Sequence, residues 1–576
     1  MEVRTVYTVL EETAAAHPHV AAMHQPLGGG KYRTWTWREY RDTVQQIAVG
    51  LRAIGVRRGD MVALQSETRA EFYLADLGVM AAGGVAAALY TSLPYPDQAQ
   101  ALQISEARWV FVESAKAMRA LQTAANGKLD ARWILLTGNE EGLLTLEDLR
   151  ADGERRMDRH PLAFDRILTE VHDSDPAVLY MTSGATGEPK MAVVTHRALV
   201  SNIDMAPAAL PIGPEDCTIA FLPSAHIAQR VVVELVPIRQ GSCVWFSESL
   251  SKLPAEIRAI KPTFFLAPPR VWERVYSTIS AEIKKRPAAI RRMFYIAVGL
   301  GSEASRLREQ GKPIPVWMKT MLRFFSRAVF SKIRERLGGR LKIAASGAAP
   351  LGKDLADFYA AIGMPLIEGY GLTEGGVAMF NPLDRPKSGS IGKLLPGVEA
   401  RIERDGELML RSPCLLTEYY KDPDATSAVL QAGWLATGDL AQVDAEGYYY
   451  ITGRKKEMIV SSNGKKIYPS RIEVLFKREP AISQVLLIGD RMPYVTALFT
   501  VNGSPADDTR AAVEQAVKTV NKQLAPFEQI RKFKILEREF SIEHGELTPT
   551  MKIRRTRVLE NHRALVSEMY MGREID

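Results

Sequence analysis

Cysteine is scarce in this sequence of 576 residues: Cys217, Cys243 and Cys414 are the three that occur, far apart in the chain. Their spacing matches neither a metal-binding motif nor a disulfide framework. This scarcity favours a reducing compartment, and we expect a cytoplasmic protein. Residues 1–19 also lack the basic and then apolar pattern of a signal peptide, so we expect no secretory leader.

Unbroken hydrophobic runs are missing as well. The nearest candidate for a membrane span is 74–93, but it contains Asp76 and three glycines. About 20 consecutive apolar residues are needed to cross a bilayer. We therefore predict a soluble protein in which 70–81 is a buried helix and 85–90 a buried strand of a parallel sheet.

Acidic residues are fewer than basic ones, which gives a formal charge of +7 and an isoelectric point near 9.0. This balance favours anionic partners such as nucleotides, acidic cofactors or a lipid headgroup surface. Basic clusters occur at 284–286, 291–292, 531–532 and 554–555, without interleaved aromatic residues. We therefore expect no nucleic-acid partner. A basic surface would permit peripheral contact with the inner face of a membrane.

The chain is too long for a single hydrophobic core, and the pattern of predicted strands and helices changes along its length. From about residue 40 to 380, apolar β-rich runs alternate with amphipathic helical stretches, which is typical of doubly wound α/β layers. The stretch 283–337 is largely helical, with a break after Gly311 at two prolines. The predicted fold class is therefore α/β.

Short strands follow from about residue 388, and Asp405-Gly406 between two of them is a hairpin signal. After about 457, strands and helices mix in an α+β texture. We predict a large N-terminal domain at 1–455, with a β-subdomain at about 385–455. A small C-terminal domain would occupy 456–576.

The most informative stretch is 180–190, which reads YMTSGATGEPK and follows an apolar run. Its glycines let backbone N–H groups approach an anion, its hydroxyls add hydrogen bonds, and Lys190 adds a cation. The spacing differs from that of the common nucleotide loop G-x-x-x-x-G-K-[ST]. The stretch predicts a loop around phosphate, although an ordinary polar turn would have a similar composition.

A second cluster, 367–374, reads IEGYGLTE. It places a ring, a hydroxyl and a carboxylate on a Gly-rich turn after a predicted strand. Tyr370 could stack on a purine, Thr373 could bond a phosphate oxygen, and Glu374 could help hold Mg²⁺. A helix-capping turn is the alternative for this cluster alone.

Three more clusters follow. Asp439 comes after Gly-containing turns at 433–438, where a carboxylate suits ribose hydroxyls. Polar residues at 453–473 include a Gly turn and a proline-started helix, at a predicted domain junction. Near the C-terminus, Lys552 follows a Thr-Pro-Thr turn and could bring a point charge to a phosphoryl group. Taken singly, the first cluster is better explained by a plain turn, and the last by a solvated basic tail.

In this order the motifs resemble those of the adenylate-forming superfamily, over nearly the whole chain. Three stretches resemble its long-chain fatty acyl-CoA synthetase branch in particular: 267–276 (APPRVWERVY), 330–351 and 547–552 (LTPTMK). The resemblance implies ATP-dependent activation of a fatty acid to acyl-adenylate, followed by transfer to coenzyme A. ATP, Mg²⁺ and coenzyme A are thus the implied cofactor and substrates, and acyl-CoA, AMP and pyrophosphate the products.

The resemblance also implies roles for individual residues. It places the β- and γ-phosphate contacts at Thr182, Ser183, Gly184, Thr186, Gly187 and Lys190. It places adenine beside Tyr370, Gly371 and the turn Gly347, Ala348 and Ala349, and ribose at Asp439 and Arg454. Thr373 would touch the α-phosphate, Glu374 and Thr182 would hold Mg²⁺, and Lys552 would stabilise the adenylation transition state.

In this family the C-terminal domain swings after adenylation. The hinge matches Lys456, and the Gly464 region would then face the thiol of coenzyme A. His226 matches a position where relatives carry a histidine or an aromatic residue near the acyl pocket. A satisfied core histidine is the alternative for His226.

The chain departs from the family pattern at two positions: Ala185 stands where Ser or Thr is usual, and Met191 replaces a glycine. The lost hydroxyl could weaken binding on the pyrophosphate side, but the other motif positions are intact, so we expect a working enzyme. A fatty acyl-AMP ligase that loads a carrier protein is one alternative, and a non-catalytic nucleotide- or lipid-binding homologue is another. The sequence leaves open the acyl chain length and whether the protein is a homodimer.

Overall fold

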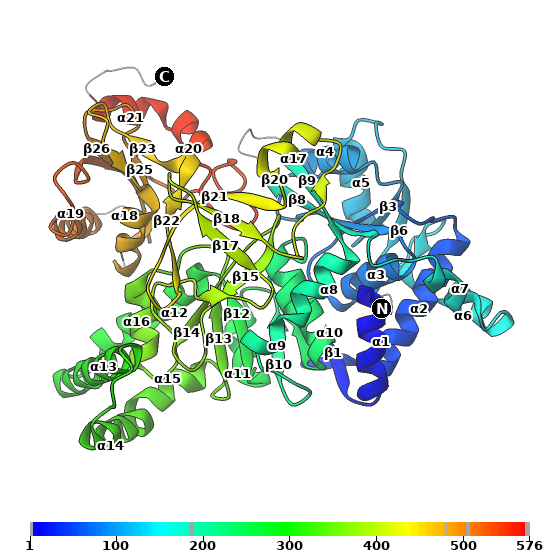
Figure 1. Cartoon of the computed structure of the whole chain (residues 1–576), viewed down its shortest axis with the longest axis horizontal. Helices are drawn as coiled ribbons and strands as arrows, with labels where there is room; N and C mark the ends of the chain where they lie inside the picture. Colours follow the sequence, from blue (N-terminus) through cyan, green and yellow to red (C-terminus); the bar gives the residue numbers. More distant parts are fainter. Residues whose placement is uncertain (1–3, 184–188, 480, 503–506, 571–576) are drawn as a thin grey trace.

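The protein has an α/β fold, seen here in a computed structural model that describes residues 4–183, 189–479, 481–502 and 507–570 (Figure 1). Two stacked regions of sheet and helix make up most of the chain. A smaller α+β part lies at the C-terminal end. The α/β class predicted from the alternating pattern is confirmed.

Within the described residues, the largest sheet has eight strands in the order β19-β9-β8-β4-β3-β5-β6-β7. Its central strands pair in parallel, and β9 is antiparallel to β8. The strands are β3 (Met61–Gln65), β4 (Val85–Ala88), β5 (Trp109–Val112), β6 (Arg132–Leu135), β7 (Leu144–Thr145), β8 (Pro176–Ser183), β9 (Pro189–Thr195) and β19 (Glu418–Tyr419). The helices of this region are α1 (Val6–Ala16), α2 (Trp37–Ala53), α3 (Ala70–Ala81), α4 (Tyr95–Ser105), α5 (Ala115–Ala124), α6 (Leu146–Arg159), α7 (Ala163–Thr169) and α8 (His196–Asp204).

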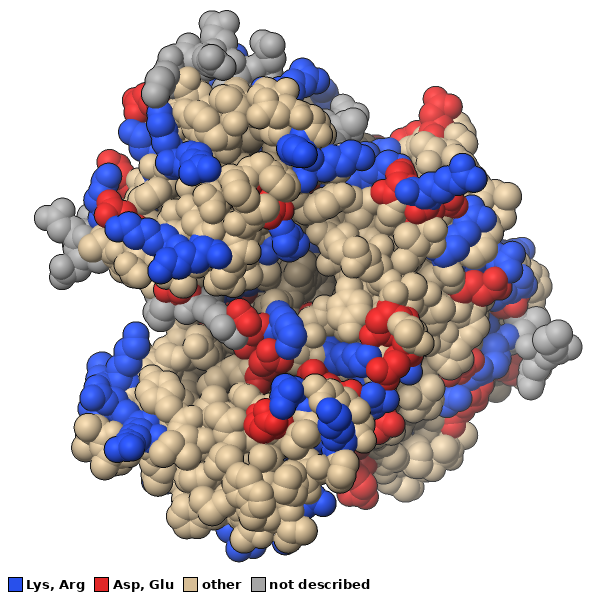
Figure 2. All heavy atoms as spheres, turned by 60° about the vertical axis from the view of Figure 1, so that its left-hand side comes forward, with Lys and Arg blue, Asp and Glu red and all other residues tan. Residues whose placement is uncertain are grey.

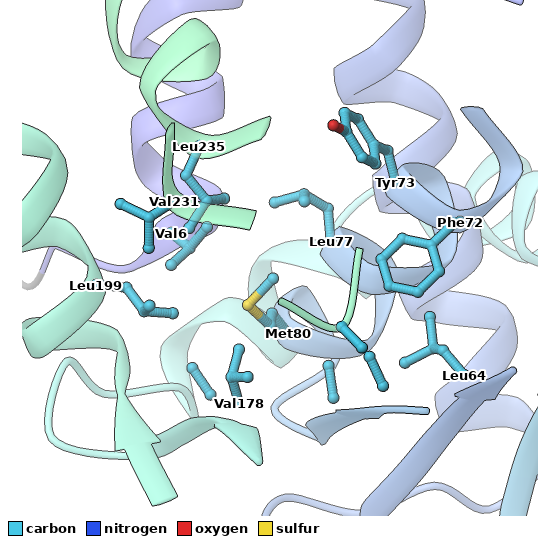
Figure 3. Packing of buried hydrophobic residues seen from close by; sticks show 14 of the residues in the cluster. Val6, Leu64, Phe72, Tyr73, Leu77, Met80, Val178, Leu199, Val231 and Leu235 are labelled. Carbon is cyan, nitrogen blue, oxygen red and sulfur yellow. The ribbon is translucent and has the colours of Figure 1, made fainter. Parts of the chain in front are cut away.

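The helix predicted at 70–81 is confirmed as α3, and the strand after it, β4, ends two residues before the predicted limit. Strand β4 is buried throughout, and so is α3 except at Glu71, because neighbouring strands and helices cover them. Helix α2 crosses α3 closely: a Cβ on Gly78 would lie 2.4 Å from Cγ2 of Ile47. Figure 3 shows the core beside α3, where Leu77 and Met80 meet Val178 of β8 and Val231.

One charged pair lies inside this core. Asp76 of α3 accepts a hydrogen bond from Arg230 at 2.5 Å, and both side chains are fully buried. Arg230 belongs to a π-helical segment, η1 (Ala228–Leu235), which also carries the buried Glu234. Burial and the nearby Asp76 carboxylate raise the pKa of Glu234 well above its ordinary value, which favours the protonated form. The polar residue that interrupted the candidate membrane span is thus part of a buried network.

A second region contains two sheets of four and five strands, in the orders β10-β11-β1-β2 and β12-β13-β14-β15-β16. Their strands are β1 (Ala21–Gly28), β2 (Lys31–Thr36), β10 (Cys217–Ala220), β11 (Cys243–Phe246), β12 (Phe264–Ala267), β13 (Ile343–Ser346), β14 (Leu366–Leu372), β15 (Gly376–Phe380) and β16 (Lys393–Leu394). The helices are α9 (Ala206–Ala209), α10 (Val236–Gln240), α11 (Leu253–Ile260), α12 (Pro269–Lys284), α13 (Ala288–Glu309), α14 (Val316–Phe325), η2 (Ser326–Phe330), α15 (Ser331–Arg336) and α16 (Lys353–Ala361). The helical stretch predicted at 283–337, with its break after Gly311, is confirmed.

A five-stranded antiparallel sheet follows in the chain, made of β17, β18, β20, β21 and β22. Its elements are β17 (Glu399–Ile402), β18 (Glu407–Arg411), α17 (Pro423–Val429), β20 (Leu430–Gln431), β21 (Trp434–Val443) and β22 (Tyr449–Arg454). The predicted hairpin is present, since β17 and β18 pair across Asp405-Gly406. This sheet carries both predicted ribose contacts, Asp439 on β21 and Arg454 on the neighbouring strand β22.

The C-terminal part has its own small cores, around a three-stranded sheet in the order β25-β26-β27. Its elements are η3 (Lys455–Glu457), β23 (Ile459–Val460), β24 (Lys466–Ile467), α18 (Pro469–Glu473), η4 (Val474–Arg478), β25 (Ile482–Ile488), β26 (Val495–Val501), α19 (Asp507–Asn521), β27 (Ile530–Ile535), α20 (Arg555–Asn561) and α21 (Arg563–Met569). Arg270 of α12 holds this part against the rest by donating to the backbone oxygen and the hydroxyl of Ser483, both at 2.6 Å. No helix in the described part of the chain has the length and apolar character needed to cross a membrane.

Candidate active site

A cavity of about 1810 Å³ opens where the large sheet, the second sheet, the antiparallel sheet and the C-terminal part meet. Strands β8, β9 and β14 contribute one wall, and the loop 547–555 closes another. The predicted site residues that line it are Thr182, Lys190, His226, Gly347, Ala348, Tyr370, Gly371, Thr373, Glu374, Arg454, Lys456 and Lys552. Segments as distant in the chain as β8 and the loop 547–555 thus share one space.

The predicted phosphate loop joins β8 to β9. Thr182 and Lys190 face each other in this antiparallel pair, and the Thr182 hydroxyl donates to the Lys190 carbonyl at 3.3 Å. The Lys190 ammonium lies 5.2 Å from the ring centre of Tyr419 and 4.0 Å from an Asp422 oxygen. Predicted contacts at Gly184, Thr186 and Gly187 lie outside the described residues, as does the side chain of Ser183.

Tyr370 lies on a strand, which corrects the predicted turn. Strand β14 leaves its parallel pairing with β13 at Glu368 and pairs antiparallel with β15 from Gly369 onward. Gly371 permits the close approach of the two strands, because a Cβ there would lie 2.6 Å from the backbone oxygen of Gly376. The turn comes later, at 373–375, where the N–H of Gly375 donates to Leu372.

Asp439 also lies within a strand rather than after a turn, in register with Arg454 of β22. Its side chain is 6% exposed. The Tyr370 hydroxyl donates to one carboxylate oxygen at 2.7 Å, and Arg454 Nε donates to the other at 2.9 Å. Burial, and then the Asp439 charge, raise the pKa of Tyr370 well above its ordinary value, so this hydroxyl remains a donor.

Glu374 is oriented by a residue that sequence reasoning missed. The Tyr419 hydroxyl donates to Glu374 Oε1 at 2.7 Å. The same tyrosine ring lies beside the ammonium of Lys190. Tyr419 reaches this place because β19 pairs with β9, a long-range contact for which its local sequence gives no signal.

Lys552 enters the cavity from the C-terminal part. Its N–H donates to the Thr548 hydroxyl at 3.0 Å, and the N–H of Thr548 donates to the Lys552 carbonyl at 2.8 Å, which closes a tight loop. Lys552 is exposed to solvent at the cavity, but desolvation by the cavity walls lowers its pKa, and the guanidinium of Arg454 lowers it further. Two cations that face one space favour an anion between them.

His226 faces the same cavity and is neutral near pH 7. Its Nδ1 accepts the N–H of Ala228 at 3.2 Å, which leaves the ring proton on Nε2. Burial, and then repulsion by Lys552, lower the pKa of His226 to about 3. The neighbouring side chains Ala228 and Val232 of η1 line the cavity too, so this wall is apolar.

Three predicted site residues are not at the cavity surface. Asp439 lies behind Tyr370 and Arg454. Ala349 is exposed on the far side of the turn whose other members, Gly347 and Ala348, line the cavity. Gly464 lies in the exposed connection between β23 and β24, away from the cavity. Its φ is +72°, and a Cβ added there would have no described atom within 4 Å.

Comparisons with known proteins show the family of the chain. Residues 10–420 match the AMP-binding enzyme family, and residues 456–574 match the AMP-binding enzyme C-terminal domain. The chain belongs to the AMP-binding enzyme family. FadD15 of Mycobacterium bovis, a long-chain-fatty-acid–CoA ligase, is 33% identical over 97% of this chain and 98% of its own length. ACSBG2 of Rattus norvegicus, with the same activity in its name, is 27% identical over 97% and 91%.

These relatives place the chain in the long-chain acyl-CoA synthetase branch of the family, as the motifs predicted. Among solved structures, the anthranilate CoA ligase AuaEII in complex with anthranoyl-AMP has a TM-score of 0.77 at 21% identity, covering 98% of both chains. The adenylation domain of a carboxylate reductase from Mycobacterium chelonae has a TM-score of 0.76 at 20% identity, covering 99% of this chain and 92% of its own. This likeness confirms the fold.

Proposed function

We propose that this protein is an AMP-forming long-chain fatty acid–CoA ligase. It would activate the acid with ATP and transfer the acyl group to coenzyme A. The observation that carries the proposal is the meeting of Lys552 with Lys190, Tyr370 and Arg454 around one cavity. A nucleoside triphosphate needs fixed cations, a surface for its base and polar groups for its sugar, and these residues offer all three.

In the first half-reaction, a carboxylate oxygen of the acid attacks the α-phosphorus of ATP, and the bond to the bridging oxygen breaks to release pyrophosphate. Negative charge grows on the α-phosphoryl oxygens, so fixed donors and cations are the main catalytic means. Lys552 and Thr373 are proposed to face these oxygens, and Thr182 and Lys190 the β- and γ-phosphates. The apolar wall near the neutral ring of His226 would accept the acid.

The adenosine is proposed to lie against Tyr370 and Gly347, with its ribose toward the Asp439–Arg454 pair. One carboxylate oxygen of Asp439 accepts the hydrogen bond from Tyr370 and the other accepts the one from Arg454. Each oxygen has a second lone pair, which can accept a hydrogen bond from a ribose hydroxyl. Tyr370 and Arg454 therefore hold Asp439 in position as well as lining the cavity themselves.

The residues present also fit a magnesium ion. The Tyr419 hydroxyl donates to one carboxylate oxygen of Glu374, which leaves the other oxygen to bind a cation. The hydroxyl of Thr182 lines the same cavity and could bind the cation too. Magnesium is usually held by one or two carboxylates together with phosphate oxygens. In the described residues no cluster of three or more His, Cys, Asp or Glu side chains could hold a metal without the nucleotide. The ion would neutralise charge on the β- and γ-phosphates.

In the second half-reaction, the sulfur of coenzyme A attacks the acyl carbonyl carbon, and AMP leaves with the electrons of the broken C–O bond. Lys552 lies in the cavity while Gly464 lies outside it, so the present arrangement suits adenylation. A swing about Lys456 is proposed to withdraw Lys552 and to bring the Gly464 region to the thiol.

The test is pyrophosphate release measured across acids from C2 to C20, with and without coenzyme A. We expect turnover with long-chain acids, and loss of about 10²–10³-fold in the adenylation rate of Lys552→Ala, the scale for one preorganised charge donor. Lys522→Ala is the matched control, since Lys522 is an exposed lysine of the same C-terminal part outside the cavity. Absence of turnover with every acid would refute the ligase activity. Near-normal adenylation by Lys552→Ala would refute the role of Lys552 alone.

A further inference from the structure

The stretch 267–276 (APPRVWERVY) has no part in the proposed reaction so far. It comprises the last residue of β12 and the start of α12, which begins at Pro269. Proline suits the first position of a helix, because its missing N–H would have no partner there. None of the residues 267–276 lines the large cavity. The stretch therefore does not touch the proposed substrates directly.

One side of this stretch is anchored in the core. Trp272 is fully buried, and its Nε1 donates to the backbone oxygens of Ala267 and Ala345, each at 3.2 Å. The Tyr359 hydroxyl of α16 donates to the Trp272 carbonyl at 2.7 Å. Ala267 and Ala345 belong to β12 and β13, two strands that also contribute to the cavity wall. The start of α12 is therefore fixed relative to the proposed site.

The other side of α12 faces the C-terminal part, which lies above it in Figure 1. Arg270 and Glu273 are three positions apart, so they lie on one face of the helix. Arg270 donates to Ser483 through two N–H groups, as described above, and its Nη2 lies 3.6 Å from an oxygen of Glu539. The Ser483 hydroxyl in turn donates to Glu539. A single guanidinium thus binds a backbone oxygen, a hydroxyl and a carboxylate of the C-terminal part.

Glu273 makes the second contact across this junction. Its carboxylate forms an ion pair of 2.9 Å with Lys477 of η4, and the Lys477 ammonium also donates to the Pro350 carbonyl at 2.7 Å. The Glu273 side chain is 14% exposed, so water screens this pair less than an ordinary surface pair. We define the latch as Arg270 and Glu273 of α12 together with Lys477 and Ser483 of the C-terminal part.

The latch also determines where Lys552 lies. Strand β25, which carries Ser483, shares a hydrophobic core with the loop 547–555, and Leu486 and Leu547 belong to that core. Figure 2 shows the surface hollowed between the C-terminal part above and the region of α13 and α14 below, with basic and acidic side chains along the hollow. The C-terminal part is thus set off from the region below it on this side. Contacts that hold Ser483 in place therefore hold Lys552 in the cavity.

We propose that Arg270 and Glu273 are positioning residues that keep the C-terminal part in the arrangement for adenylation. The latch would have to release before the acyl group passes to coenzyme A. This inference rests on the proposed two-step function and on its swing about Lys456. Contacts made in one arrangement stabilise that arrangement alone. Loss of the latch should therefore slow adenylation and spare acyl transfer, whereas a merely structural role of α12 would slow both.

The test measures the two half-reactions separately in single turnovers. Adenylation is followed with ATP and the best acid of the C2 to C20 series, and transfer with coenzyme A and acyl-adenylate supplied ready-made. Arg270→Gln should slow adenylation at least about tenfold, the scale for losing hydrogen bonds to a charged group. Its transfer step should be as fast as in the parent protein or faster. Arg274→Gln, at an exposed arginine of the same stretch, is the matched control and should change neither step.

A charge exchange tests the second contact. Glu273→Lys and Lys477→Glu should each slow adenylation, and the double variant should recover most of the rate because the ion pair forms again with the charges exchanged. The matched control is the exposed ion pair between Glu282 of α12 and Arg336 of α15, which does not involve the C-terminal part. Glu282→Lys and Arg336→Glu should leave both steps unchanged. Circular dichroism verifies that each variant is folded.

Amide hydrogen exchange of the free protein adds a measurement that needs no turnover. In Arg270→Gln, η4 and β25 should exchange faster than in the parent, and α2 should exchange as before. Equal slowing of both half-reactions, no recovery in the charge exchange, or unchanged amide exchange would overturn the latch. A parent protein that turns over no acid would refute the ligase activity instead, and amide exchange would then decide on the latch alone.

Discussion

Glu368 gives a stability prediction whose size follows from its surroundings. It lies on β14, two residues before Tyr370, and is 6% exposed. Its Oε1 accepts the N–H of Gly389 at 3.2 Å. Burial raises the pKa of Glu368 to about 7, although the backbone donors and the charge of Lys477 act in the opposite direction.

The sign of the effect follows from linkage. Below the ordinary pKa of about 4.5, Glu368 is protonated in both the folded and the unfolded chain, and the protein has its full stability with respect to this group. As the pH rises to about 7, the unfolded chain releases the proton first, so the free energy of unfolding falls. A shift from 4.5 to about 7 corresponds to a loss of about 3 kcal/mol, fully developed at pH 8.

Glu368→Gln keeps the shape of the protonated acid and removes the titration. We expect urea unfolding to give the variant and the parent similar stability at pH 4, and the variant an advantage of about 3 kcal/mol at pH 8. Glu418→Gln, at an exposed glutamate of β19, controls for the change in total charge. A stability difference that does not grow between pH 4 and pH 8 would refute this account of Glu368.

Three further changes test other parts of the fold. Lys456→Pro at the proposed hinge should slow acyl transfer to coenzyme A more than adenylation in single-turnover assays; equal loss in both halves contradicts the hinge. Glu234→Gln should stabilise the protein at pH 8 and not at pH 4, since both oxygens of the buried Glu234 lack hydrogen-bond partners among the described residues and its pKa is raised. Urea unfolding at the two pH values measures this, and an equal effect at both contradicts it. Met191→Gly, toward the family pattern, should lower the free energy of unfolding by about 3 kcal/mol or more, because Met191 is 3% exposed in β9. A neutral result would show that the strand does not depend on this side chain.

Much of the fold could be predicted from local patterns. The helix α3, the hairpin of β17 and β18, and the helical stretch around α13 follow from apolar periodicity and turn residues. The limits of the strands were predicted less accurately, because Tyr370 and Asp439, which were predicted to lie at turns, lie within strands. The glycines at these places were interpreted as turn residues. In the structure Gly371 allows two strands to approach closely, and Gly438 adopts a positive φ within a strand.

The sequence by itself determined the motifs, their order and the family, because glycines, hydroxyls and lysines at fixed short spacings encode local backbone shape and chemistry. Only the tertiary structure decided which of them share a space. Tyr419 reaches Glu374 through the pairing of β19 with β9, and Arg230 reaches Asp76 across 154 positions. Burial and neighbouring charge also arise only when distant segments exclude water together. The raised pKa of Glu234 and the low pKa of His226 are therefore properties of the folded chain.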